Sequence, residues 1–232
     1  MTKMTTLLAL LTLIVTLPLH AAGDIGVGIT ADMPRVEFKI NGKTHVIERN
    51  QNTRAIIDPR FARTSRPCPP FCIQPMTLAP GVETIGELEV IDYLQRMSKG
   101  ENILVIDSRT PDWVKHGTIP GATNIPWTGI NPKQGATTEG IVKILTSKFG
   151  VKLAEGKDSF DVDEAIVAGD TSKVFDFSNA KTLVLFCNGM WCGQSPNNIM
   201  NLLKFGYPPE KLKWYRGGMQ DWAVLGLSTE SK

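Results

Sequence analysis

The chain has 232 residues, of which 42% are hydrophobic and 21% are charged, and its formal net charge is +2. This composition is ordinary for a globular protein and too apolar for a disordered one, and a charge so near zero gives no electrostatic reason to expect nucleic acid as a partner. The length allows one domain of ordinary size with an appendage, or two small domains. Three histidines, none of them beside a cysteine or another histidine, argue against a metal site of the zinc type.

The first residues have the pattern of an export signal. Lys3 precedes an uncharged apolar run over residues 4–19, and small residues follow at 21–23. A basic start, a short apolar stretch and a small-residue exit are typical of a cleaved signal peptide, and the run is shorter than the roughly 20 residues of a membrane span. We expect residues 1–23 to be a signal peptide, with the cut after residue 21, 22 or 23. The protein would then be exported, to the periplasm if the source is a Gram-negative bacterium, with no stable membrane span.

Export changes how the four cysteines are interpreted. Cys68 and Cys72 form one close pair, and Cys187 and Cys192 form another. Outside the cytoplasm a close pair is a disulfide candidate, and four cysteines allow three connectivities. The spacing favours local pairing within each pair, and cross-pairing stays open.

Residues 24–80 are expected to form an N-terminal extension. Alternating apolar and polar residues at 36–40 and 45–48 flank Asn41-Gly42, a strong hairpin signal. Dense prolines from Pro67 onward disfavour regular helices and strands, so we expect a β-hairpin followed by a segment that wraps the next domain and narrows its active-site mouth. Cys68 and Cys72 would be a structural clip or a redox pair. The extension also carries arginines that either lie on a solvated surface or attract an anion: Arg49, Arg54, Arg60, Arg63 and Arg66.

From residue 81 to residue 232 the chain alternates between helix and strand patterns. Continuous apolar runs at 103–106 and 182–186 are typical of strands buried on both faces, and shorter strands are expected at 122–125 and 213–215. This alternation indicates an α/β domain with a mainly parallel sheet between helices. Residues 128–179 look like an insertion, in which 155–164 is an acidic surface excursion. Apolar spacing predicts helices at 83–99, around 141–149, at 196–205 with Ser195 as N-cap, and at 217–225.

The segment after the second buried strand carries the chemistry. Cys187 stands at the carboxyl end of that strand, where ligands bind in open parallel sheets. Gly189 and Gly193 let the loop turn its N–H groups inward, and the helix that follows favours an anion at its start. A thiolate among such donors has a lowered pKa and is nucleophilic. The residues alone predict either an activated Cys187 in an anion-binding cradle or a buried cysteine that only packs.

Three motifs in order resemble the rhodanese family. Residues 106–109 and 117–126 are similar to its Asp-x-Arg … Gly-His-Ile-Pro-Gly-Ala-x-Asn-Ile-Pro signature, residues 183–187 to the strand that leads to its catalytic cysteine, and residues 216–222 to its Gly-Gly-x-x-x-Trp ending. The resemblance covers about residues 83–228. It implies a rhodanese-like fold and transfer of sulfane sulfur through a persulfide, with no cofactor.

Carried onto this chain, the resemblance assigns roles to individual residues. Cys187 is the nucleophile, and the Asp107 and Arg109 pair is expected to brace the active-site loop through a charge-assisted hydrogen bond rather than to touch substrate. The partners are a small sulfur-containing donor and a thiol or anionic acceptor, which a protein thiol could supply. The loop that holds the charged sulfur comprises Asn188, Gly189, Met190, Trp191, Cys192, Gly193, Gln194 and Ser195.

The sequence also departs from the family pattern. Thr118 replaces the usual histidine, and His116 stands before the glycine instead. The loop is about two residues longer than the commonest sulfurtransferase form and contains no Arg or Lys. Without the arginine that would bind a dianion, phosphatase activity is not expected.

Cys192 leaves the mechanism open. It could attack a persulfide on Cys187 and act as a resolving thiol, or it could pack beside Trp191 without a chemical role. Met190 and Trp191 either form an apolar rim at the pocket mouth or simply pack under the extension. We therefore expect an exported sulfurtransferase. The alternatives are a thiol–disulfide oxidoreductase or persulfide reductase that uses both cysteines, and a non-catalytic module that binds an anion or a thiol.

Overall fold

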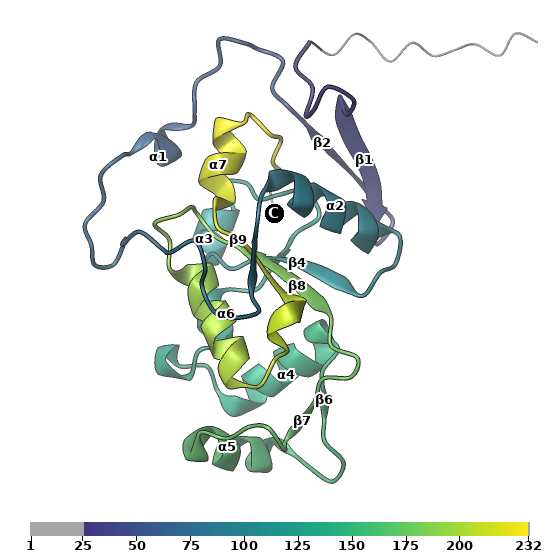
Figure 1. Cartoon of the computed structure of the whole chain (residues 1–232), viewed down its shortest axis with the longest axis vertical. Helices are drawn as coiled ribbons and strands as arrows, with labels where there is room; N and C mark the ends of the chain where they lie inside the picture. Colours follow the sequence, from purple (N-terminus) through teal and green to yellow (C-terminus); the bar gives the residue numbers. More distant parts are fainter. Residues whose placement is uncertain (1–25, 232) are drawn as a thin grey trace, which may run out of the picture.

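A computed structural model describes residues 26–231, so the predicted signal peptide lies outside the described residues. A five-stranded parallel sheet with strand order β3-β9-β8-β4-β5 occupies the centre of the molecule (Figure 1). The predicted α/β class with a mainly parallel sheet is confirmed. The strands of this sheet are β3 (Glu83–Ile85), β4 (Ile103–Asp107), β5 (Thr123–Asn124), β8 (Thr182–Phe186) and β9 (Leu212–Tyr215).

Two hydrophobic clusters lie on opposite faces of this sheet. Successive side chains of a strand point to opposite faces, so in β8 Leu183 and Leu185 join one cluster while Val184 and Phe186 join the other. This is why the central strands are continuously apolar. Helices α2 (Glu87–Ser98) and α7 (Gly218–Val224) cover one face, and α4 (Thr138–Phe149) and α6 (Gln194–Lys204) cover the other. Helix α5 (Ser159–Ala168) packs against α4 farther from the sheet (Figure 1).

The remaining elements are short. They are the helices α1 (Pro59–Ala62) and α3 (Pro111–Val114), the 3-10 turns η1 (Trp127–Ile130), η2 (Pro132–Gln134) and η3 (Pro209–Lys211), and the paired strands β6 (Lys152–Leu153) and β7 (Phe175–Asp176). Across residues 26–231, no helix combines the length and apolarity that crossing a membrane requires.

The N-terminal hairpin forms as predicted. Strands β1 (Arg35–Ile40) and β2 (Lys43–Glu48) pair antiparallel around Asn41-Gly42, and both turn residues have positive φ. The hairpin lies beside α2 (Figure 1), and its apolar face belongs to the same core cluster as α2 and α7. The hairpin is therefore a part of the main core and not a separate unit.

After the hairpin, the chain runs through α1 along the edge of the molecule and reaches the start of α6 (Figure 1). A Cys68–Cys72 disulfide closes a small loop in this segment. Hydrogen bonds tie it down, among them one from the Gln74 N–H to the Met190 carbonyl at 2.8 Å, one from Arg216 to the Gln74 carbonyl and one from Gln220 to the Phe61 carbonyl. The segment thus wraps over the loop that contains Cys187 and Cys192.

Two sequence-based boundaries are wrong at the start of a helix. Residues 83–85, predicted as the first turn of a helix, form edge strand β3, because their backbone pairs with β9 and Ile85 points into the core. Ser195 is not the N-cap of α6, since Gly193 takes that position and α6 begins at Gln194. The Ser195 hydroxyl contacts Cys187 and Trp214 instead of a backbone amide.

The predicted surface excursion at 155–164 is mostly exposed, and helix α5 begins within it. The Asp158 carboxylate accepts hydrogen bonds from the N–H groups of Phe160 and Asp161, and Asp161 reaches back to the N–H of Asp158. This reciprocal pair is a capping box, a signal that is present in the sequence.

Candidate functional site

Cys187 lies directly after β8, at the carboxyl edge of the sheet, and is almost fully buried. The Ser195 hydroxyl donates a hydrogen bond to its sulfur at 3.1 Å, and the thiol faces the Cys192 carbonyl at 3.3 Å. Its own carbonyl accepts the N–H of Met219 in α7 at 2.9 Å. The sulfur is therefore held between the first turn of α6 and the loop that precedes it.

These contacts change the pKa of Cys187. Burial alone raises it, because the charged form loses its hydration. Hydrogen bonds from the Cys192 thiol, from the hydroxyl and N–H of Ser195 and from the N–H of Gly189 outweigh burial and lower the pKa to about 7. A thiol with this pKa is substantially a thiolate at neutral pH and is a nucleophile.

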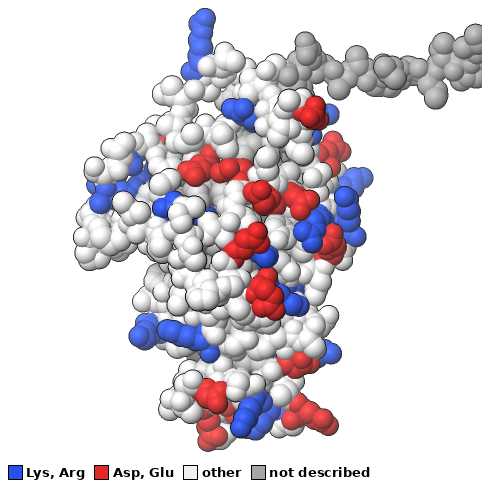
Figure 2. Space-filling model, in the orientation of Figure 1, with Lys and Arg blue, Asp and Glu red and all other residues white. Residues whose placement is uncertain are grey.

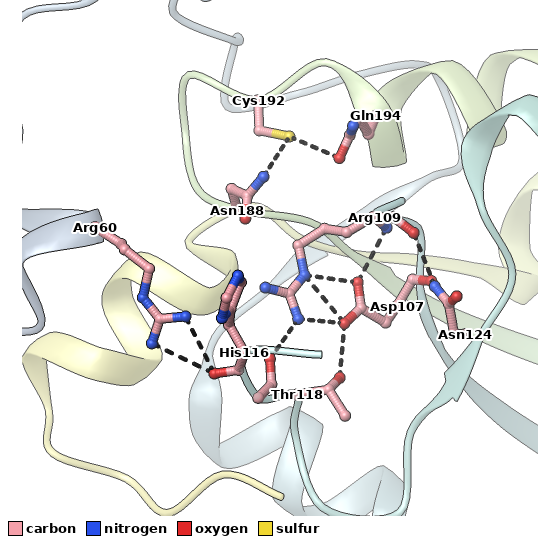
Figure 3. A network of polar contacts seen from close by, with 10 residues as sticks. Arg60, Asp107, Arg109, His116, Thr118, Asn124, Asn188, Cys192 and Gln194 are labelled. Atoms are coloured by element: carbon pink, nitrogen blue, oxygen red, sulfur yellow. Dashed lines mark hydrogen bonds and ion pairs between the residues drawn. The ribbon is translucent and has the colours of Figure 1, made fainter. Parts of the chain in front are cut away.

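Cys192 has the opposite tendency. Burial, the hydrogen bond to Cys187 and the charge of the Cys187 thiolate raise the pKa of Cys192 well above its ordinary value. Its sulfur lies 4.0 Å from Asn188 Nδ2 and 3.7 Å from Gln194 Oε1 (Figure 3). Of the two thiols, Cys187 loses its proton first and Cys192 keeps its proton.

The pairing of Cys187 with Cys192 that spacing favours is absent from the structure, in which both are free thiols. The Cys192 N–H donates to the Gly189 carbonyl at 2.9 Å and closes a tight turn. In this turn the carbonyl of Cys192, and not only its sulfur, faces Cys187. The structure therefore corresponds to the reduced form of the pair.

A buried ion pair lies beside the loop without bracing it. Arg109 forms a two-point contact with Asp107, its Nη2 also donates to the Gly117 carbonyl at 2.7 Å, and both side chains are almost completely buried. Figure 3 shows the guanidinium of Arg109 turned toward Asp107 and away from Cys192. The expected bracing of residues 188–195 by this pair is therefore wrong. Because Arg109 follows Asp107 by only two residues, it binds that carboxylate locally, and the pair stabilises residues 107–124 rather than the cysteine loop.

A pocket of about 410 Å³ opens over the cysteine loop. Cys192 lies in its wall, whereas Cys187 does not. The extension supplies Arg66, Pro70 and Phe71, while helix α3 supplies Trp113 and the 3-10 turn η1 supplies Trp127. Another cavity of about 380 Å³ lies between η2, α5 and α6, and its lining contains no cysteine. The pocket at Cys192 thus brings solvent to one member of the thiol pair.

A family model described as the rhodanese-like domain matches residues 90–224. The chain belongs to the rhodanese-like family. No curated protein matches it. Similar solved structures include a Bacillus halodurans protein with 18% identity and a TM-score of 0.40, which covers 64% of this chain and 77% of that one. A Rhodopseudomonas palustris protein of unknown function, described as a possible tyrosine phosphatase, has 17% identity and a TM-score of 0.39, with 64% and 85% covered.

A third structure, a thiosulfate sulfurtransferase from Pseudomonas aeruginosa, has 16% identity and a TM-score of 0.35. It covers 65% of this chain, and the matching part is 20% of the Pseudomonas protein.

The rhodanese motifs have clear positions in the structure. Gly218, the second glycine of the Gly-Gly-x-x-x-Trp ending, lies so close to the cysteine loop that an added Cβ would be 2.9 Å from the Gly189 nitrogen. Trp222 of the same motif, on α7, is buried in the core cluster to which α2 also contributes. The ending therefore presses helix α7 against the loop that holds Cys187.

Thr118, at the position where the rhodanese pattern has histidine, has a structural role. Its hydroxyl donates to Asp107 Oδ2 at 2.7 Å and completes the buried network around that carboxylate. His116 lies outside this network, and its backbone carbonyl accepts from Arg60 (Figure 3). Because threonine replaces histidine here, a neutral hydroxyl donor lies beside the buried ion pair of Asp107 and Arg109.

The predicted loop residues do not share one environment. Asn188, Trp191, Gly193 and Gln194 line the pocket with Cys192, whereas Gly189 and Ser195 hold the sulfur of Cys187 from behind. Met190 packs against the cluster that contains the two cysteines, and its carbonyl accepts a hydrogen bond from the N–H of Gln74 in the extension. Sequence reasoning missed Trp113, Trp127 and Phe71 as pocket residues, although Trp113 lies between the two parts of the recognised 106–126 motif and Trp127 directly follows it.

Proposed function

We propose that this protein is an exported rhodanese-like sulfurtransferase that carries sulfane sulfur as a persulfide on Cys187. The observation that carries the proposal is the donor set around the Cys187 sulfur, which lowers its pKa to about 7 despite burial. The same donors would stabilise the negative charge of a persulfide, because backbone N–H and hydroxyl groups bind anions strongly in a dry site.

The transfer has two balanced steps. The Cys187 thiolate attacks the outer sulfur of a donor R–S–SH, a new S–S bond forms on Cys187, and the donor S–S bond breaks to release RS⁻. An acceptor thiolate then attacks the outer sulfur of the Cys187 persulfide and leaves with it, which restores the Cys187 thiolate. No net oxidation or reduction of the protein occurs, so no cofactor is required.

Intact-mass measurement tests this proposal. The reduced protein is incubated separately with thiosulfate and with an organic persulfide, and the Cys187→Ser variant serves as the control. We expect a gain of one sulfur atom on Cys187 that is absent in the variant and is removed by an acceptor thiol. No gain with either donor would contradict sulfur transfer and would favour a module that binds an anion or a thiol.

The position of Cys192 favours a second candidate, a persulfide reductase or thiol–disulfide oxidoreductase. Cys192 contacts Cys187 and lies in the pocket wall, and its raised pKa keeps a proton available. As Cys192 attacks the inner sulfur of a Cys187 persulfide anion, this proton would pass to the departing outer sulfur, so that a Cys187–Cys192 disulfide forms and HS⁻ is released. An external dithiol would then have to reduce this disulfide.

The Cys192→Ser variant separates the two candidates. If Cys192 is a resolving thiol, the variant accumulates the Cys187 persulfide, and the wild type loses two hydrogens and gains a Cys187–Cys192 link. If Cys192 is structural, the variant transfers sulfur at the wild-type rate, which would contradict the reductase.

Export is part of the proposal and has its own test. The apolar run at residues 4–19 and the small residues after it support a cleaved signal. Cell fractionation and sequencing of the mature N-terminus should find a chain that begins after residue 21, 22 or 23, outside the cytoplasm. A cytoplasmic chain that retains its first residues would contradict it.

A further inference from the structure

The extension adds a cation to a pocket whose cysteine loop has none. Figure 2 shows basic side chains gathered at the left edge of the molecule, where the segment around α1 lies in Figure 1. Arg60 is paired with Asp58, and Arg49 donates to the Leu225 carbonyl. Arg66 differs from both, because it lines the pocket at Cys192. It is the only charged side chain among the described residues of that lining.

Arg66 is held in place with part of its hydrogen-bonding capacity unused. Its guanidinium carbon lies 3.7 Å from the centroid of the Trp191 ring, and its Nη2 donates to the Arg60 carbonyl at 3.2 Å. Its Nε is buried and has no hydrogen-bond partner, and within residues 26–231 no carboxylate forms an ion pair with it. Burial lowers the pKa of Arg66, and the charge of Arg63 lowers it further. A planar cation in this state is suited to a two-point contact with a carboxylate.

The Trp191 ring that supports Arg66 is itself fixed. Its Nε1 donates to Gln220 Oε1 at 2.8 Å, and the edge of Phe71 packs against its ring at 5.6 Å between centroids. A cation held over an aromatic face that does not move needs little ordering when a ligand binds, which favours affinity. The arrangement is thus a preformed contact and not a solvated arginine.

The size and lining of the pocket point to an organic ligand. A volume of about 410 Å³ falls in the range of sites for organic molecules, and a small inorganic sulfur anion would leave most of it to water. Trp113 and Trp127 add apolar walls to the pocket that Arg66 and Cys192 also line. Such walls bury the body of a molecule and leave its charged end to the arginine.

We infer that the pocket binds a carboxylate-bearing organic sulfur compound of small-peptide size, with its carboxylate on Arg66 and its sulfur toward Cys192 and Cys187. The sulfur chemistry of this ligand rests on the proposed function, whereas the carboxylate contact does not. The extension, which lies outside the 90–224 match, thereby sets the substrate class of the rhodanese domain.

Binding of an unreactive ligand tests the inference independently of sulfur transfer. S-methylglutathione has no sulfane sulfur, and its dimethyl ester lacks the carboxylate charges. Calorimetric titration of the reduced full chain should show that wild type binds the acid about tenfold more tightly than the ester, the size expected for a hydrogen-bonded charge pair. In Arg66→Gln, acid and ester should bind alike and weakly. Arg63→Gln, which changes a neighbouring exposed arginine, should behave like the wild type.

Other outcomes overturn the inference. These are equal binding of acid and ester by the wild type, no binding of either, an unchanged affinity in Arg66→Gln, or thiosulfate binding at least as tight as that of S-methylglutathione. Thermal unfolding of both variants checks that the fold is intact. If thiosulfate and organic persulfides fail to load Cys187 but the acid still binds through Arg66, the proposed function fails and the binding site stands.

Discussion

Ser195 links the chemistry of the site to the core behind it. Its hydroxyl donates to the Cys187 sulfur and accepts a hydrogen bond from Trp214 Nε1 at 3.2 Å. The indole donor fixes the direction of the hydroxyl, so its proton points at the sulfur. A side chain buried on the sheet therefore helps to set the pKa of the nucleophile.

Replacing Ser195 with Ala should make Cys187 less reactive at neutral pH. The loss of one donor to the thiolate raises the pKa of Cys187 from about 7, and a hydrogen bond of ordinary net strength corresponds to roughly one pH unit. The rate of alkylation by iodoacetamide, measured against pH in a Cys192→Ser background, should therefore have a midpoint at higher pH. Ser172→Ala, at an exposed site, is the control, and an unchanged midpoint in Ser195→Ala would contradict the role of the hydroxyl.

At the scale of elements, the site lies where β8, α6 and α7 converge. The N-terminus of α7 touches the cysteine loop through two backbone hydrogen bonds, from Met219 N–H to the Cys187 carbonyl and from Gln220 N–H to the Asn188 carbonyl. Gly218 allows this approach, because its φ is +55° and its missing Cβ leaves room for the loop. The helix thus shapes the cradle mainly through its backbone, and its Gln220 side chain adds one contact, to Trp191.

Gly218→Ala should distort the cradle and lower the reactivity of Cys187. The new Cβ would collide with the backbone of Cys187 and Gly189. The alanine would also have to adopt a left-handed backbone conformation, which costs about 1–2 kcal/mol for an L-residue. Urea unfolding should show that cost plus about 1–3 kcal/mol from the collision, with slower alkylation of Cys187. Gly135→Ala is the matched control, since Gly135 has φ +87° and open space around its Cβ position. Equal effects of the two substitutions would show that the close approach is unimportant.

At the scale of the whole molecule, the two ends of the described chain are joined. Glu230 Oε2 accepts from Lys43 Nζ and lies 3.0 Å from His45 Nδ1, both on β2, and Oε1 accepts from the Gly121 N–H at 3.2 Å. Ser228 adds bonds to the backbone of β2. The C-terminal segment therefore fixes the hairpin to the sheet.

This junction gives a prediction for stability in acid. Burial raises the pKa of Glu230, but bonds from Lys43 and the Gly121 N–H and the proximity of His45 leave it below its usual 4.5. A carboxyl whose pKa is lowered on folding stabilises the fold above its unfolded pKa, and this stabilisation is lost as pH falls through the folded value. In urea unfolding at several pH values, Glu230→Gln should lose less stability than wild type as pH falls from neutral to below 4.5 and through the folded pKa of this carboxyl. Glu155→Gln, at an exposed site, should follow the wild type, and parallel curves for Glu230→Gln would contradict the linkage.

The extension should also control access to the thiols. Deleting it would remove Val36, Phe38 and Ile47 from the core, so a single substitution is the sharper test. Phe71→Ala removes a wall of the pocket and an aromatic contact to Trp191, and labelling of the thiols by a bulky maleimide should become several-fold faster. Labelling by methyl methanethiosulfonate, which is small, should hardly change. Phe160→Ala, on α5, is the control, and equal maleimide rates in all three proteins would contradict the role of Phe71.

The sequence by itself determined the α/β class, the hairpin at Asn41-Gly42 and the position of Cys187 after a buried strand. Short-range sequence patterns determine these features: turn residues, apolar runs and a motif of fixed order. Edge strand β3 escaped sequence reasoning because its pairing with β9 joins residues more than a hundred positions apart. A helical apolar spacing continued through it, and only the distant partner decided its conformation.

The features of the site also divide into those that local sequence determines and those that depend on distant contacts. The sequence placed Cys187 and its loop together because they are neighbours in the chain. Only the tertiary structure decided that Ser195 serves the sulfur and not a helix cap, that Arg109 satisfies Asp107 locally, and that Arg66 lies on Trp191. Each of these depends on which partner a polar or charged group finds when the chain is buried. A buried group takes the partner that the folded geometry supplies, and sequence spacing does not encode that geometry.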